Sequence, residues 1–168
     1  NPSPQRYLLN RPLPCYRHLP GQTPHPIKSI QGHSYALKTN DVDTPLSIEN
    51  YYQHDTYLWG IDLFNHAYWW EAHEAWEGPW KLATELVATF LQGLIQISAT
   101  LLKWHQGQSQ GQHKLYRKGK NKLLHVIDQN PTSIYMGLDL VVFLDRLELC
   151  LALPPKSCPQ MSPVLIRL

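Results

Sequence analysis

Apolar side chains recur at helical spacing through the middle of the chain, between about residues 47 and 153. The clearest stretch runs from Leu82 to His105, where apolar residues follow one another at intervals of three and four. That period places them on one face of an α-helix. The pattern therefore predicts a long amphipathic helix at the centre of a helical domain. The residues of this stripe are Leu86, Phe90, Leu94, Ile97 and Leu101.

Four further helices are predicted around the central one, and no segment alternates apolar and polar residues over the length of a strand. Turn-forming residues separate the helices, notably at Gly107–Gly111 and Asn130–Pro131. The fold class that follows is all-α, a compact bundle of about five helices. The four ranges are residues 54–65, Tyr68 to Trp76, Gln112 to Asp128 and Met136 to Ala152.

The second of these helices contains a break signal. Pro79 has no amide hydrogen to donate to the Ala75 carbonyl, and its ring crowds that carbonyl, so Gly78–Pro79 should end or kink the helix. Trp80 would lie on the same face of the helix as Glu77 and His73 only if the helix continues through Pro79.

Prolines divide the chain into three parts, because most of the 14 lie near its two ends. Each one fixes φ, removes a donor and disfavours helix in the residue before it. Residues 1–46 are therefore predicted to be a Pro- and His-rich N-terminal arm, and residues 154–168 a Pro-rich tail. The arm carries too much apolar area for a free tail, so we expect it to pack on the helical domain of residues 47–153. We expect the apolar end of the tail, Val164 to Ile166, to pack there too.

Composition narrows the classes of function. The net charge of +2 is too small to predict nucleic-acid or membrane binding, and no apolar run approaches the roughly 20 residues of a membrane span. An odd number of cysteines (Cys15, Cys150 and Cys158) without metal-type pairing argues against a disulfide framework and favours a cytoplasmic location. We interpret the basic face of the Gln112–Asp128 helix as a solvated face. The partners left open are a small molecule and a second copy of the chain.

One polar constellation interrupts the apolar pattern of the two central helices. His73 and Glu77 are one turn apart on one helix, and Gln92 and Gln96 are one turn apart on the next. Because a short turn joins these helices, we expect an antiparallel pair whose four polar side chains share one layer. Glu74 lies about 100° round the helix from His73, and its neighbours on the helix surface are instead Trp70 and Glu77.

Two interpretations of this constellation stay open, and enzyme activity is undecided between them. In the first, a structural network fixes helix packing in a non-enzymatic interaction module, because buried polar groups must be paired. In the second, the constellation is a functional site, since a His with a carboxylate one turn away can bind a divalent metal ion or act as a general base. The candidate metal ligands and catalytic residues are His73 and Glu77, and the candidate ligand-binding residues are Glu74, Trp80, Gln92 and Gln96.

A metal site would need at least a third protein ligand. The HExxH spacing of zinc proteases is absent, since Glu77 stands where a second His would be needed. The candidates for the third ligand are His66, Glu74 and a histidine of the arm. The arm holds histidines at spacings of seven and eight, which could form a metal site of their own or simply bond to backbone and solvent. They are His18, His25 and His33.

The residues around the constellation resemble a known family. Residues 55–150 are similar to the bacterial and archaeal family catalogued as domain of unknown function 309. Its HxxxExxW motif is matched by His73, Glu77 and Trp80, its QGLIQ stretch by residues 92–96, and its later basic, Gly-rich helix by residues 107–122. The resemblance implies a small five-helix, all-α fold, and the family's label implies a metal-dependent hydrolase. The chain departs from the pattern at Ala67, where a Gly is often found, and at residues 78–79 inside the motif.

Overall fold

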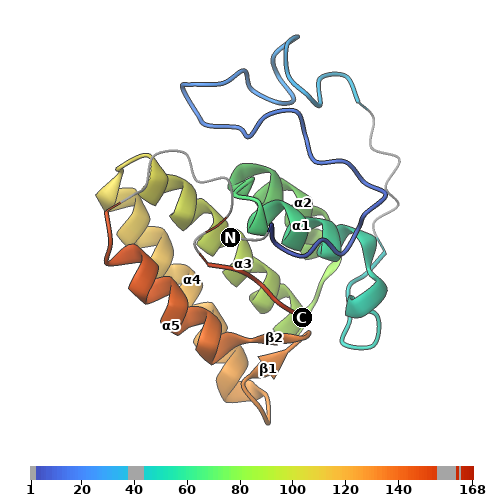
Figure 1. Ribbon diagram of the computed structural model, residues 1–168. Helices are drawn as coiled ribbons and strands as arrows, with labels where there is room; N and C mark the ends of the chain where they lie inside the picture. Colours follow the sequence, from blue (N-terminus) through green and yellow to red (C-terminus); the bar gives the residue numbers. More distant parts are fainter. Residues whose placement is uncertain (1–2, 38–43, 155–161, 163) are drawn as a thin grey trace.

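The computed structural model describes residues 3–37, 44–154, 162 and 164–168. These residues contain five α-helices and one short hairpin, which confirms the all-α fold class. Figure 1 shows α3 between the α1–α2 pair on one side and α4 and α5 on the other. The elements are a 3-10 turn Tyr51–Gln53, α1 Asp55–Asn65, α2 Trp69–Leu82, α3 Glu85–His105, α4 Ser109–Gln129, β1 Ile134–Tyr135, β2 Leu138–Asp139 and α5 Leu140–Leu151.

The central helix α3 packs most extensively on α4 and next on α2. Its predicted stripe is confirmed, because four of the five residues are fully buried and Leu86 is half-buried. By length and composition α3 could also span a membrane, but more than half of it is buried against its neighbours, as in the core helix of a soluble protein. This burial places α3 at the core of the bundle.

Two glycines let α3 and α4 cross closely. A Cβ at Gly93 would lie 2.6 Å from Cδ2 of Leu123, and a Cβ at Gly119 would lie 3.2 Å from the Gly93 carbonyl oxygen. Real Cβ atoms essentially never show the first distance and seldom the second, so larger residues would require the helices or their side chains to shift. The crossing fixes which flank of α3 faces α4.

Of the two outcomes predicted for Gly78–Pro79, an end or a kink, the end is wrong, because α2 continues to Leu82. A proline has a helical φ, so the cost is confined to one missing hydrogen bond and local crowding. Pro79 is buried, and Trp80 packs against the core. This burial offsets the lost hydrogen bond and holds the last turn in place.

The predicted starts of the three later helices differ from the structure. The third helix starts at Glu85, and the fourth at Ser109 inside the predicted Gly-rich loop. The fifth prediction is wrong over its first turn, because residues 134–139 form a hairpin. Met136 and Gly137 both have positive φ, as a tight hairpin turn requires. Asp139 then caps α5 by accepting from the amides of Val141 and Val142.

The described part of the N-terminal arm packs on α1 and α2. The carboxylate of Asp62, which is fully buried in α1, accepts hydrogen bonds from the backbone amides of Tyr7 at 2.8 Å and Leu8 at 2.9 Å. The Nε atom of Arg6 lies 3.1 Å from the same carboxylate. Asp62 is thus an anchor for the arm, and its buried charge is paired.

The end of the C-terminal tail also packs back, as expected. The side-chain amide of Asn65 pairs with the backbone of Ile166, with N···O distances of 2.8 and 2.7 Å. Val164 and Ile166 are buried in the core. The tail therefore closes over the end of α1.

Candidate metal site

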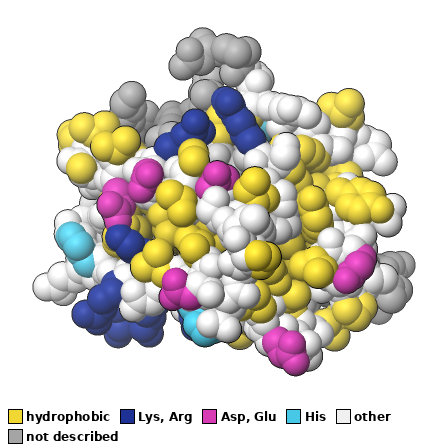
Figure 2. Space-filling model, turned by 90° about the horizontal axis from the view of Figure 1, so that it is seen from below, with side chains coloured by type: hydrophobic (Ala, Val, Ile, Leu, Met, Phe, Trp, Pro, Cys, Tyr) yellow, Lys and Arg dark blue, Asp and Glu magenta, His cyan; other side chains and the backbone are white. Residues whose placement is uncertain are grey.

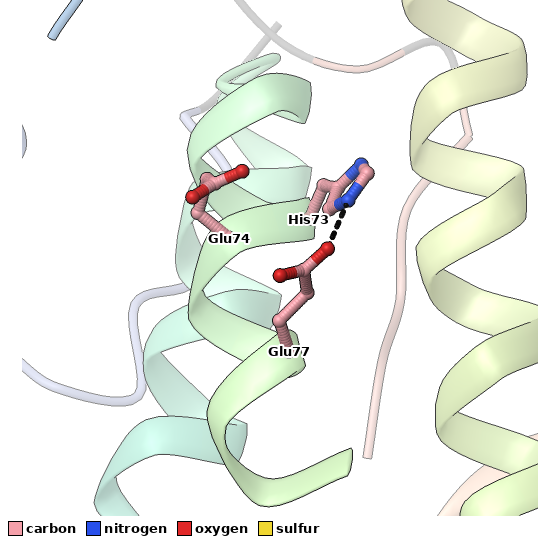
Figure 3. Close-up of side chains that lie close together, drawn as sticks. All are labelled: His73, Glu74 and Glu77. Atoms are coloured by element: carbon pink, nitrogen blue, oxygen red, sulfur yellow. Dashed lines mark hydrogen bonds and ion pairs between the residues drawn. The ribbon is translucent and has the colours of Figure 1, made fainter. Parts of the chain in front are cut away.

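Three ionisable side chains of α2 converge on one surface of the helix (Figure 3). Nε2 of His73 lies 2.8 Å from Oε1 of Glu77. One ligand atom from each of His73, Glu74 and Glu77 lies within 4.8 Å of the other two. The helix itself produces this arrangement, because residues three and four apart are neighbours on its surface. The sequence-predicted pair is therefore brought together, and Glu74 joins it.

The cluster is open to solvent rather than sealed in the core. The side chains of His73 and Glu77 are 29% and 32% exposed, respectively. Nζ of Lys81 lies 3.5 Å from Oε2 of Glu77, so the cluster extends one turn further along α2. This accessibility would let an ion or a substrate reach the three ligand atoms.

The pKa values of the Glu74 and Glu77 carboxyl groups are shifted in opposite directions. Burial, and then the negative charge of Glu77, raise the pKa of Glu74 above its ordinary value. For Glu77, burial alone would raise the pKa, but the hydrogen bond and positive charge of His73, together with Lys81, outweigh it and lower the pKa. Neighbouring carboxyl groups whose pKa values are shifted apart are common at sites that bind a cation or transfer a proton.

Glu74 and Glu77 also line a cleft of about 380 Å³ between the arm and helices α1 and α2. A volume of a few hundred Å³ is typical of small-molecule sites. Two indole rings, of Trp59 and Trp70, form apolar parts of its wall. The guanidinium of Arg11, another lining residue, lies 4.7 Å from the centre of the Trp59 ring. The candidate metal cluster thus stands beside a cleft that has both apolar and charged walls.

The arm histidines His18, His25 and His33 lie around the preceding turn of α2, at Trp70 and Glu71, and not in the metal-ligand cluster. Oε1 of the buried Glu71 accepts from the His18 amide at 2.7 Å and lies 3.1 Å from Nε2 of His33. The rings of His18 and His25 lie 4.9 and 5.4 Å from the Trp70 ring. Burial raises the pKa of the Glu71 carboxyl. Glu71 is therefore a second anchor for the arm.

Sequence reasoning did not single out Asp62 or Glu71. Their backbone partners in the arm, Tyr7, Leu8 and His18, lie more than 50 residues away in the chain, so no helical spacing marks them. The only signal is an acidic residue among aromatic ones, as in the run from Tyr68 to Trp70 that precedes Glu71. A charge placed in such a run implies a buried partner.

The other candidate ligands lie apart from the cluster. Nδ1 of His66 is 2.8 Å from the Asp62 carbonyl oxygen of its own helix, so His66 is not the third ligand in this arrangement. Trp80 is half-buried against the core and is not among the residues that line the cleft. Of the third ligands considered from the sequence, the structure places Glu74 with His73 and Glu77.

Gln92 and Gln96 line a different groove, between α3 and α4. Within the described parts of the chain, no hydrogen bond joins either glutamine to His73 or Glu77, and the groove shares no lining residue with the cleft. The reason is the crossing at Gly93 and Gly119, which turns this flank of α3 towards α4. The constellation expected from the sequence is therefore divided between two surfaces.

Comparison with curated proteins and with solved structures found no match. A family model described as domain of unknown function (DUF309) matches residues 57–115. This segment covers most of α1, all of α2 and α3 and the first turns of α4, and so holds the His73–Glu74–Glu77 cluster and both glutamines. Over residues 57–115 the chain thus has the resemblance to the domain of unknown function 309 family that its sequence indicated.

Proposed function

We propose that the helical domain binds a divalent transition-metal ion through His73, Glu74 and Glu77 and uses it to hydrolyse a small substrate held in the adjoining cleft. The observation that carries the proposal is the convergence of three ligand atoms within 4.8 Å on a solvent-accessible surface beside that cleft.

The donor set fits such an ion. One imidazole and two carboxylates suit zinc, manganese or iron, and three protein ligands leave positions for water and substrate, as catalytic sites do. The raised pKa of Glu74 supports the fit, because it arises partly from the neighbouring negative charge of Glu77. A divalent cation between the two carboxylates would cancel that repulsion.

The chain's own residues would divide the work in the cleft. A bound ion of this kind polarises a carbonyl or phosphoryl group and lowers the pKa of water. Trp59 and Trp70 offer flat apolar walls that hold the substrate body and exclude water. Arg11 and Lys81 stand in the same cleft among the carboxylates of Glu71, Glu74 and Glu77, so the cleft offers partners for both charged and polar groups of a substrate.

A second role for the cluster is favoured by one specific observation. The contacts from His73 to Glu77 and from Glu77 to Lys81 form a ladder of i,i+4 pairs that spans Pro79, where the helix lacks a hydrogen bond. This ladder would stabilise the last turns of α2. Exposed pairs of this kind contribute only about 0.3–0.5 kcal/mol each, so the structural role alone predicts small effects of substitution.

Metal analysis separates the two roles. Protein purified without a His-tag and incubated with zinc or manganese should retain about one ion per chain after desalting, by plasma mass spectrometry. His73→Ala and Glu77→Gln should abolish retention, whereas the control His113→Ala, at an exposed histidine of α4, should retain the ion. Absence of retained metal in the unaltered protein, or equal retention in His73→Ala, would refute the metal site and leave the helix ladder.

We further propose a cytoplasmic location for this soluble domain. Its support is chemical, since Cys15 is an exposed free thiol. Free thiols persist in reducing compartments. Cell fractionation with an antibody to the chain tests the proposal, and recovery from a membrane or secreted fraction would contradict it. Cys158 lies outside the described residues.

A further inference from the structure

The groove between α3 and α4 is lined entirely by polar and basic side chains. It has a volume of about 610 Å³, and no acidic residue lines it. In the described part of the chain, neither Lys118 nor Lys122 forms an ion pair, whereas nearby Lys120 pairs with Glu148. The lining residues are Thr89, Gln92 and Gln96 of α3 and Lys118, Asn121, Lys122 and His125 of α4.

These side chains are held together by the rigid crossing beneath them. The α4 residues are three and four apart, and therefore occupy one face. A Cβ at Gly119 would lie 3.2 Å from Cβ of Gln96, so the two helices meet at the floor of the groove. Like charges at i and i+4, as at Lys118 and Lys122, destabilise a helix by a few tenths of a kcal/mol. An anion in the groove would remove that cost.

One of the lining residues also has a polar atom that lacks a partner. Oε1 of Gln96 is buried and makes no hydrogen bond within the described structure. A buried acceptor without a donor is unfavourable, whichever way the amide is turned. If its side chain turns into the groove, Gln96 can accept the missing hydrogen bond from a ligand hydroxyl, and the amides of Gln92 and Asn121 can each both donate and accept.

We propose that this groove binds a small phosphate monoester that carries hydroxyl groups, such as a sugar phosphate. Lys118, Lys122 and His125 bind the phosphate, and the amides of Gln92, Gln96 and Asn121 bind the hydroxyl groups. Amide side chains suit hydroxyl groups because both partners donate and accept. The site is separate from the metal cluster and does not depend on it.

A nucleic acid fits this groove less well. Apart from His125, no lining residue has a ring on which a base could stack. On the face shown in Figure 2, Lys and Arg side chains stand in separate groups with acidic and hydrophobic side chains between them, and form no continuous basic stripe. A small ligand with one phosphate matches a local group of cations better than a long polyanion does.

Isothermal titration calorimetry of the full chain with ribose 5-phosphate, inorganic phosphate and ribose tests the proposal. We expect ribose 5-phosphate to bind at one site, inorganic phosphate to bind more weakly, and ribose to show no binding. Lys118→Gln/Lys122→Gln should weaken binding of ribose 5-phosphate by about tenfold or more, as expected for lost charge-assisted hydrogen bonds. Gln96→Leu should weaken ribose 5-phosphate but leave inorganic phosphate unchanged.

A matched control removes the same charge elsewhere on α4. Lys114 and Arg117 are exposed and lie outside the groove, so Lys114→Gln/Arg117→Gln should bind ribose 5-phosphate as the unaltered chain does. Equal weakening in both double variants would overturn the proposal, because it would show that binding depends on the net charge of the chain and not on the groove. No saturable binding of ribose 5-phosphate, or its displacement by a tighter-binding single-stranded oligonucleotide, would overturn it as well. Circular dichroism of each variant establishes that it is folded.

Discussion

Replacing Gly60 with alanine tests how α2 is seated on α1. A Cβ at Gly60 would lie 2.0 Å from Nε1 of Trp76 and 2.4 Å from Cε2 of the same ring. Trp76 is fully buried, and its Nε1 donates to the Tyr57 carbonyl at 3.2 Å. The indole would therefore have to move, and its hydrogen bond would break. Because Glu77 follows Trp76 directly, the same contact positions the His73–Glu74–Glu77 cluster relative to the cleft.

The size of the effect follows from three contributions. Overpacking a core site costs about 1–3 kcal/mol, and leaving the buried indole donor unpaired adds about 1–3 kcal/mol. The better helix propensity of alanine offsets roughly 0.5–1 kcal/mol of this. We expect a net loss of about 3 kcal/mol, which corresponds to a fall in Tm of about 6–12 °C for a chain of this size.

Urea denaturation followed by tryptophan fluorescence, with calorimetry for Tm, measures this loss. Gly111→Ala is the matched control, since its Cβ would lie 3.5 Å from the flexible Lys103 side chain, an ordinary contact. That control should leave stability unchanged or raise it by less than about 1 kcal/mol. If Gly60→Ala unfolded at the same urea concentration as the unaltered chain, the packing of Trp76 against α1 described above would be refuted.

Three other predictions follow from the same structure. Asp62→Ala should release the arm, since it removes the acceptor of the Tyr7 and Leu8 amides, and limited proteolysis should then cleave within residues 9–37; unchanged resistance would contradict the anchor. Burial raises the pKa of Tyr57 far above its ordinary value, so the neutral phenol contributes stability that is fully present below about pH 10 and is lost as the pH rises above it, because the phenol then ionises in the unfolded chain. Tyr57→Phe should therefore make the free energy of unfolding depend less on pH in urea titrations at alkaline pH. An unchanged pH dependence would contradict this prediction. Without added metal, His73→Ala should cost less than about 1 kcal/mol, because the His73–Glu77 pair is partly exposed; a larger loss of stability would indicate a buried structural network.

Local spacing was enough to predict the helices and the core of the candidate site. The stripe through Phe90, Leu94 and Ile97 follows from a period of 3.6 residues, and the pairing of His73 with Glu77 follows from the same helix geometry. Both features lie within a few residues of sequence. They needed no knowledge of how the helices pack.

Features that depend on distant partners could not be predicted in the same way. Whether Gln92 and Gln96 face α2 or α4 depends on the contact between Gly93 and Gly119, which only the packed pair of helices reveals. The role of Asp62 depends on arm residues more than 50 positions away. The persistence of α2 beyond Pro79 depends on tertiary burial, which here outweighs the local penalty of proline.

Anomalous diffraction tests the central claim most directly. Crystals of the full chain grown with zinc or manganese would be measured on both sides of the absorption edge of the metal. We expect one strong peak bonded to Nε2 of His73 and to a carboxylate oxygen of each of Glu74 and Glu77. A peak among the arm histidines instead, or an empty His73–Glu74–Glu77 cluster in the presence of the metal, would contradict it.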